Sequence, residues 1–173
     1  MQGKGQIMQK GLTLIELLMG LVVVGILAVL ATPAFHSLIE SQRRHDAAQQ
    51  LTTGLRMARV EAIQRGYPVI VQASGGRWSD GWSVFVDTNR NRYRDENETT
   101  LAERNGHRRV KVIGNGRVSS QVGFDSSGRL LNNANGTLAV CHKDSPASHF
   151  QIAIAVTGRV TLRSEGFSIE PCA

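Results

Sequence analysis

Residues 11–35 read GLTLIELLMGLVVVGILAVLATPAF. The 19 residues from Leu17 to Phe35 include no charged side chain, so the apolar content is concentrated near one end of the chain. At a rise of about 1.5 Å per residue, a helix of this length spans the hydrocarbon core of a bilayer. Lys4 and Lys10 precede the run, and no positive residue follows it at once. This charge bias predicts a single-pass protein with a cytoplasmic N-terminus and the rest of the chain outside.

The composition excludes several classes of protein. The 173 residues include 20 Lys+Arg against 14 Asp+Glu, which gives a formal net charge of +6, with two cysteines and 5% aromatic residues. Neither a disordered chain nor a disulfide-dense mini-protein has this composition, and the length is short for a multi-domain enzyme. No nucleophile motif, phosphate loop or pair of carboxylates in an apolar setting occurs, so we expect no enzymatic activity.

Glu16 lies inside the apolar segment, where an unpaired carboxylate is energetically costly. In one interpretation it lies in the headgroup region near the start of the helix, where a carboxylate also interacts favourably with the helix dipole. In the other interpretation it requires a positive partner, which a free amine of a neighbouring chain would supply.

The heptapeptide GLTLIEL at residues 11–17 resembles the type III signal of type IV pilins and type II secretion pseudopilins. The resemblance implies that a prepilin peptidase removes the leader 1–11 by cleaving between Gly11 and Leu12, and methylates the new N-terminus. It also implies that Glu16 pairs with the N-terminal amine of an adjacent subunit, and that Pro33 corresponds to a proline found in many pilin helices. Leu12 departs from the family pattern, which usually has Phe after the cleavage site.

The helix is expected to continue beyond the membrane. Small and apolar residues recur at helical spacing and form an amphipathic stripe, at Ile39, Ala47, Leu51, Leu55, Ala58 and Ala62. Gly66 and Pro68 end the pattern. We therefore predict one long helix, with a transmembrane and assembly half at 12–35 and an amphipathic half at 36–66.

Residues 67–173 are predicted to form a β-rich head packed on this stripe. Short runs rich in β-branched or aromatic residues alternate with turn signals and indicate strands. These runs are Val69–Ala73, Trp82–Val86, Arg109–Ile113, Val118–Phe124, Thr137–Cys141, Phe150–Val156, Arg159–Leu162 and Phe167–Ile169. The polar segment Asp87–Arg109 is expected to be a loop.

The head carries a second resemblance. The block WSDGWSVFVDTN at 78–89, with Asp95 and Glu98 after it, and the closing GRV at 158–160 are similar to minor pilins of the GspH/FimT/FimU type. The resemblance implies an α+β fold, with a long N-terminal pilin helix packed on a head of antiparallel sheets.

The function that this resemblance implies is that of a minor type IV pilin, which primes or tips the pilus. Its implied partners are other minor and major pilins and an inner-membrane assembly platform. The head would be periplasmic while the helix spans the inner membrane, and extracellular once the subunit is in the pilus. A type II secretion pseudopilin is the alternative within the same class.

One segment of the head has the spacing of a calcium-binding loop. Its oxygen-bearing side chains occupy positions 1, 3, 5, 9 and 12 of an EF-hand-like loop, at Asp87, Asn89, Asn91, Asp95 and Glu98. Arg92 stands at position 6, where glycine is usual, and two further arginines add charge that opposes a dication. The alternative is a solvated turn whose Asp and Asn side chains cap their own backbone. No cofactor other than calcium is expected.

Cys141 and Cys172 are the two cysteines. In an extracytoplasmic head they can oxidise, and a bridge would tie the C-terminal tail to the sheet. Such a bridge closes a loop of about 30 residues, and the loop-entropy model gives it about 3–4 kcal/mol. The alternative is two free buried thiols. No histidine shows the spacing of a zinc ligand.

The positive charge of the head is a candidate site for DNA. Its candidate residues are Arg108, Arg109, Lys111, Arg159 and Arg163, and such a basic strip attracts phosphate backbones by counterion release. Members of the FimT branch are DNA receptors that use arginines in a Gly-Arg-x-Arg element, which is stretched in this chain. Arg159 and Arg163 are expected on one face of a strand. The alternative is a solvated basic face.

Overall fold

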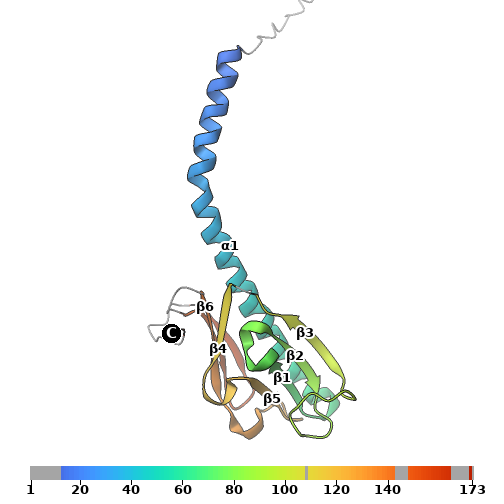
Figure 1. Cartoon of the computed structure of the whole chain (residues 1–173). Coiled ribbons are helices and arrows are strands. Elements are labelled where there is room, and N and C mark those ends of the chain that lie inside the picture. Colours follow the sequence, from blue (N-terminus) through green and yellow to red (C-terminus); the bar gives the residue numbers. More distant parts are fainter. Residues whose placement is uncertain (1–12, 108, 143–147, 165–171, 173) are drawn as a thin grey trace, which may run out of the picture. The chain divides into compact units, whose positions relative to one another are not determined.

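The structure is a computed structural model, which describes residues 13–107, 109–142, 148–164 and 172, with the backbone alone at 30–34, 36, 142, 148 and 149. The chain divides into two units, Met1–Ile39 and Glu40–Ala173. One helix, α1 (Leu14–Arg65), contains 52 residues and belongs partly to each unit (Figure 1). The helix is assigned without interruption through Pro33, as the single long helix predicted from the sequence requires.

The C-terminus of α1 is formed by a glycine. Gly66 has a φ of +71°, and its N–H donates a hydrogen bond of 3.1 Å to the carbonyl of Ala62. Glycine adopts this left-handed conformation without the steric cost that a Cβ atom adds, so it terminates helices. Pro68, which cannot continue the helix, follows and leads directly into the first strand.

The head contains two four-stranded antiparallel sheets (Figure 1). The first has the order β3-β2-β1-β5 and is formed by β1 (Val69–Ala73), β2 (Gly81–Val86), β3 (Thr100–Asn105) and β5 (Gln121–Phe124). The second has the order β4-β6-β7-β8 and is formed by β4 (Val110–Gly114), β6 (Gly136–His142), β7 (Ser148–Ile154) and β8 (Val160–Arg163). The α+β class with antiparallel sheets is therefore confirmed.

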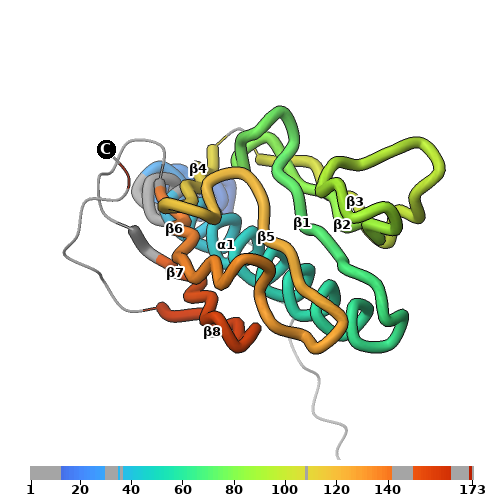
Figure 2. The backbone as a smooth tube through the Cα atoms, turned by 90° about the horizontal axis from the view of Figure 1, so that it is seen from below, coloured from blue at the N-terminus to red at the C-terminus, as the bar shows by residue number. Residues whose placement is uncertain are grey.

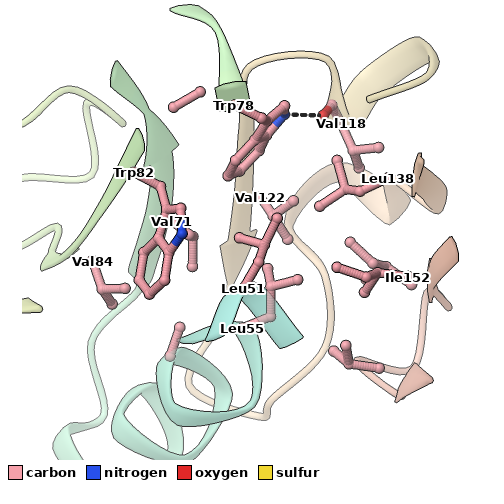
Figure 3. Close-up of a cluster of buried hydrophobic side chains, with 14 of the residues drawn as sticks. Leu51, Leu55, Val71, Trp78, Trp82, Val84, Val118, Val122, Leu138 and Ile152 are labelled. Carbon is pink, nitrogen blue, oxygen red and sulfur yellow. Dashed lines mark hydrogen bonds between the residues drawn. The ribbon is translucent and has the colours of Figure 1, made fainter. Parts of the chain in front are cut away.

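Both sheets share one hydrophobic core with the C-terminal part of α1. Four residues of the predicted stripe are buried here, Leu51, Leu55, Ala58 and Ala62, whereas Ala47 is half-buried and its neighbour Ala48 is buried instead. Figure 3 shows Leu51 and Leu55 directed toward residues from both sheets, including Val122 and Ile152. In Figure 2 the same part of α1 lies along β1 and β2 on one side and along β6 to β8 on the other. Ile39, predicted on this stripe, is instead exposed.

Two tryptophans complete the core next to the helix. The Nε1 of Trp78 donates a hydrogen bond of 2.9 Å to the carbonyl of Val118, so the buried indole leaves no polar atom unpaired (Figure 3). The ring of Trp82 lies against Gly54 of α1, where a Cβ atom would be 2.5 Å from Trp82 Cη2. Gly54 therefore allows the indole to approach the helix backbone closely.

The structure corrects two expectations about the strands. Thr100–Asn105, placed by the sequence in the polar segment Asp87–Arg109, is the edge strand β3. Its residues are half-buried or exposed, so it lacks the apolar alternation that identifies a strand covered on one face. Val118, expected in a strand, lies in a short 3-10 helix at Gly116–Val118. The run Phe167–Ile169 lies outside the described residues.

Candidate functional site

The part of α1 in the first unit of the chain has an exposed, largely apolar surface. We term this the assembly surface, and it comprises residues 14–29, 35, 38 and 39. Every side chain from 14 to 29 is exposed, and Leu14 is 79% exposed. Leucine, isoleucine and valine lie on all sides of this helix, and a helix that is apolar all round is normally covered by lipid or by other helices. Searched over the described residues alone, no helix has a stretch both long and apolar enough to cross a membrane.

Glu16 lies in the first turn of α1. Its N–H approaches both the carbonyl oxygen of Thr13, at 3.1 Å, and the Thr13 hydroxyl, at 3.4 Å. Its carboxylate is exposed, and among the described residues it forms no ion pair. The carboxylate is thus accessible to a group from another molecule. Gly11 and Leu12, the predicted processing residues, lie outside the described residues.

Cys141 and Cys172 form the disulfide predicted from the sequence. Their Cα atoms are 6.0 Å apart, and both residues are buried, together with Ala139. The Nζ of Lys111 donates a hydrogen bond of 3.0 Å to the carbonyl of Cys172. Since Lys111 of β4 pairs with Cys141 of β6, the bridge and this hydrogen bond together attach the C-terminal end of the chain to two adjacent strands.

The predicted DNA-binding residues that the structure describes do not lie together in one group. Arg109 and Lys111 belong to the β4 edge of the second sheet, whereas Arg163 belongs to β8 at the opposite edge, with β6 and β7 between them. Three strand spacings amount to about 14 Å. Arg109 also forms an ion pair of 3.3 Å with Glu40, and Lys111 binds the carbonyl of Cys172. Arg108 lies outside the described residues.

Arg159 and Arg163 are both exposed, and the buried Val160 between them lies on the opposite side of the strand. This agrees with the expectation that the two arginines share a face. The two arginines are thus exposed cations at the β8 edge of the sheet, and they are separated from Arg109 and Lys111 at the β4 edge.

Gly158, the first residue of the Gly-Arg element, has a structural role. Its φ is +79°, and a Cβ atom built there would overlap the carbonyl oxygen of Gly128. Arg59 of α1 joins the same two turns, because its Nε donates to the Gly128 carbonyl at 2.9 Å and its guanidinium donates to the Thr157 carbonyl at 3.2 Å. This role of Arg59 was not predicted, since no local pattern in the sequence indicates that a guanidinium bridges two distant turns.

We predict that Gly158→Ala lowers the free energy of unfolding by about 3 kcal/mol or more, since it adds a left-handed non-glycine residue and a backbone overlap. Gly76→Ala is the matched control, because Gly76 has a φ of +78° with no atom within 4 Å of an added Cβ. That variant loses only about 1–2 kcal/mol from conformation. Chemical denaturation of both variants measures the difference, and equal losses would contradict the proposed close packing of the two turns.

The five side chains of the predicted calcium loop lie between β2 and β3. Asp87 and Glu98, at the two ends of the loop, are buried, whereas Asn89 and Asn91 are exposed. Asp95 accepts hydrogen bonds of 2.7 Å from the side-chain amides of both asparagines. Within the described residues, no three histidine, cysteine or acidic side chains lie together in a group that would itself hold a metal ion.

Comparison with known proteins identifies matches to both parts of the chain. The model of a family described as type II transport protein GspH matches residues 47–158. A model described as the prokaryotic N-terminal methylation motif matches residues 7–32. The first match covers the end of α1 and most of the head, and the second covers the end of the leader and residues 14–29 of the assembly surface.

Individual relatives agree with these matches. The pilin-like protein PilA1 of Thermus thermophilus is 38% identical over 96 residues, which are 52% of this chain and 56% of that protein. The chain thus spans little more than half the length of this curated relative.

Solved structures of similar fold include the type IV minor pilin FimU of Pseudomonas aeruginosa, with a TM-score of 0.60, 21% identity, and coverage of 75% of this chain and 96% of that one. The minor pseudopilin EpsH of the Vibrio cholerae type II secretion system gives a TM-score of 0.55, 16% identity, and coverage of 74% and 98%. At these identities the likeness concerns the fold, a helix followed by a head of antiparallel sheets.

Proposed function

The chain belongs to the GspH family of pilins and pseudopilins, and on this basis we propose that it is a minor subunit of a type IV pilus, incorporated through its N-terminal helix. Proteins of this family are structural components, so the chain is not an enzyme. They are processed by a prepilin peptidase and assemble with other pilins. The choice of a pilus over a secretion machine is supported by the 38% identity to a pilin-like protein.

The observation that carries this proposal is the exposed apolar helix. Every side chain of α1 from 14 to 29 is exposed, while one face of the amphipathic part of the same helix is buried in the core of the head. Burial of apolar surface contributes about 25 cal/mol per Å², so covering this helix drives its association strongly. Packing against equivalent helices of neighbouring subunits covers it in a filament.

We infer two environments for the assembly surface. Before assembly the segment is anchored in the inner membrane, with the head in the periplasm, where the Cys141–Cys172 disulfide is stable. After assembly the helices of minor and major pilins replace the lipid, and the head lies on an extracellular filament. The inner-membrane assembly platform is the proposed site of this transfer.

The role that we assign to Glu16 follows from its position. A carboxylate among exposed apolar side chains is costly in lipid unless it gains a positive partner. Cleavage after Gly11 would create an amine at Leu12, and the same amine on a neighbouring subunit is the partner that we propose for Glu16. The pair would form only between subunits, and would therefore favour assembly over isolated anchoring.

We do not extend the proposal to DNA binding. A nucleic-acid site requires several cations that contact neighbouring phosphates, and Arg109 and Lys111 lie at the opposite edge of the sheet from Arg163. Those at the β4 edge also have partners within the head.

Mass spectrometry of filaments sheared from cells that express the full chain tests the proposal. We expect the chain to be present at low abundance, with methylated Leu12 as its first residue. A Gly11→Ala variant serves as the matched control, and is expected to remain unprocessed in the membrane. The pilus proposal fails if the processed chain is absent from surface filaments, and the whole assembly proposal fails if Met1 or another residue is the N-terminus.

A further inference from the structure

The loop between β2 and β3, residues 87–98, contains a buried carboxylate oxygen that has no partner. Asp87 follows β2 directly and is 1% exposed. Its Oδ2 accepts a hydrogen bond of 3.1 Å from the N–H of Arg92, which directs the carboxylate into the loop. Its Oδ1 is buried and has no hydrogen-bond partner among the described residues. A buried charged oxygen is costly unless hydrogen bonds, an opposite charge or a metal satisfies it.

A cation-binding loop requires this arrangement, in which one carboxylate oxygen is held by the loop backbone and the other is left to bind the ion. Asp87 is at position 1 of the twelve-residue spacing and Arg92 is at position 6. The hydrogen bond from position 6 holds the carboxylate in one orientation, so that its second oxygen is left to bind an ion. A turn that merely capped its own backbone would have no need to bury an unpaired oxygen.

The backbone of the loop has the curvature that such a site needs. Arg90 and Arg92 have φ values of +63° and +66°, in the left-handed region that costs a non-glycine residue free energy. Position 6 of an EF-hand-like loop is normally glycine because the chain makes a sharp turn there. Arg92 therefore adopts the conformation for which glycine is usually required, and the missing glycine does not prevent the turn.

The same loop carries three further side chains with oxygen atoms, those of Asn89, Asn91 and Asp95. The N–H of Asn91 donates to Asn89 Oδ1 at 3.1 Å, and the N–H of Tyr93 donates to Asn91 Oδ1 at 2.7 Å. Both asparagine amides donate to Asp95 Oδ2 at 2.7 Å, so each asparagine side chain lies within hydrogen-bonding distance of Asp95.

Glu98 closes the other end of the loop. Its carboxylate accepts hydrogen bonds from the N–H groups of Thr88, at 2.8 Å, and of Asp95, at 3.2 Å. Glu98 is 8% exposed, so the carboxylates at both ends of the loop, Asp87 and Glu98, are buried. The two buried acidic groups leave the loop with excess negative charge at its base.

The arginines do not point their charge at this base. The guanidinium of Arg92 donates to Asn132 Oδ1 at 2.8 Å, and that of Arg94 pairs with Glu103 at 3.4 Å. Both partners lie outside the loop, and Arg90 is exposed. The electrostatic objection raised by the sequence is therefore weakened, because the guanidinium groups of Arg92 and Arg94 bind partners outside the loop.

We propose that loop 87–98 binds one Ca²⁺ ion. Asp87 Oδ1 is the anchoring ligand, the side-chain oxygens of Asn89, Asn91 and Asp95 and the backbone carbonyl of Tyr93 complete the set, and Glu98 supplies charge. All of these donors are oxygens, and flexible sites with carboxylate, amide and carbonyl oxygens favour Ca²⁺ over zinc or other transition metals. The asparagines and the carbonyl supply three of these five ligands, so the site does not depend on a cluster of three acidic or nitrogen ligands.

The ion would join the end of β2 to the segment that leads into the exposed edge strand β3. Because β3 is the edge strand of its sheet and pairs with β2, a cross-link at this loop is expected to stabilise that edge. The arginines and the lack of glycine favour weak binding, with a Kd of about 10⁻⁴–10⁻³ M, the range of extracellular calcium modules.

Calcium titration of the full chain in detergent tests the proposal, with Tb³⁺ luminescence as the local probe. Tyr93 belongs to the loop, so its ring should sensitise the luminescence of bound Tb³⁺, and added Ca²⁺ should displace the Tb³⁺ and reduce this emission. In a separate melt without Tb³⁺, added Ca²⁺ should raise the Tm of the chain. Tyr93→Phe should retain calcium binding and lose most of the sensitised emission. Asp87→Asn should weaken calcium binding by at least about tenfold, the loss typical even of an outer-shell partner.

Asp125→Asn is the matched control, because Asp125 forms a comparable turn without a cation-loop spacing. Burial raises the pKa of Asp125, but hydrogen bonds from Ser127 and Arg129 and the charge of Arg129 together lower the pKa below its ordinary value. Loss of the Asp125 carboxylate should lower the Tm by the same amount with and without calcium.

Arg92→Gly guards against misfolding of the Asp87 variant. It removes a left-handed arginine and one positive charge, so it should bind calcium more tightly than the original chain. The proposal is overturned if calcium leaves the Tm of the folded wild-type chain unchanged and no sensitised Tb³⁺ emission is seen. It is also overturned if Asp87→Asn binds calcium as tightly as the wild-type chain, or if Arg92→Gly binds calcium no more tightly than the wild-type chain.

Discussion

Replacing Glu16 with alanine is expected to prevent the chain from entering filaments while its head remains folded. In the proposed filament the carboxylate pairs with the N-terminal amine of a neighbouring subunit, and removal of one partner from a buried ion pair costs about 3–5 kcal/mol. This corresponds to a loss of roughly a hundredfold or more in association at each such contact. Glu16 lies in the first unit of the chain, and the head core lies in the second.

The measurement is the amount of the chain in sheared filaments relative to the amount in membranes. Asp46→Ala is the matched control, since Asp46 is an exposed carboxylate of the same helix whose described hydrogen bond is to Gln42 within that helix. It should leave incorporation unchanged. Normal incorporation of the Glu16 variant, together with an unchanged denaturation midpoint, would contradict the intersubunit role of this carboxylate.

Leu55→Ala is expected to be the most destabilising truncation to alanine in the helix. Leu55 is 0% exposed and belongs to the cluster that joins α1 to both sheets (Figure 3). Truncation of a fully buried leucine removes its transfer free energy and leaves a cavity, at a cost of about 2–5 kcal/mol. Since the two sheets meet on this part of the helix, the cavity weakens the packing of both sheets against it.

Denaturation of the full chain in mild detergent, followed by tryptophan fluorescence, measures this loss. Val60→Ala is the control on the same helix, because Val60 is 48% exposed and its truncation should alter the free energy of unfolding by less than about 0.5 kcal/mol. Trp82 lies against Gly54, close to Leu55 in the helix, and so reports on the packing of this region. Similar losses in the two variants would show that the stripe is not the main contact between helix and sheets.

Local patterns predicted most of the fold. The helix is one continuous element with apolar or stripe-forming residues along its length, and glycine and proline end it at the predicted place. Seven of the expected strands are present within the described residues, because each has β-branched residues between turn signals. β3 was missed because an edge strand with one neighbour does not need an apolar face, and its polar residues are typical of a loop.

The candidate sites divide along the same line. The leader motif, Glu16 and the cysteine pair were recognised from residues close in sequence or from the presence of only two cysteines. Arg109 and Arg163 were grouped by charge alone, whereas the strand order β4-β6-β7-β8 places them at opposite edges of a sheet. Strand order depends on contacts between distant segments, so no local pattern encodes it.

By itself, the sequence determined that this chain has an apolar N-terminal helix with a processing signal, a β-rich head and a loop with calcium-like spacing. Tertiary structure alone decided that Asp87 Oδ1 is buried without a partner among the described residues, that Gly158 must be glycine because it meets the Gly128 carbonyl, and that Arg109 and Arg163 lie at opposite edges of a sheet. Spacing and periodicity reflect the geometry of one segment, whereas burial and close approach depend on which other segments pack against it.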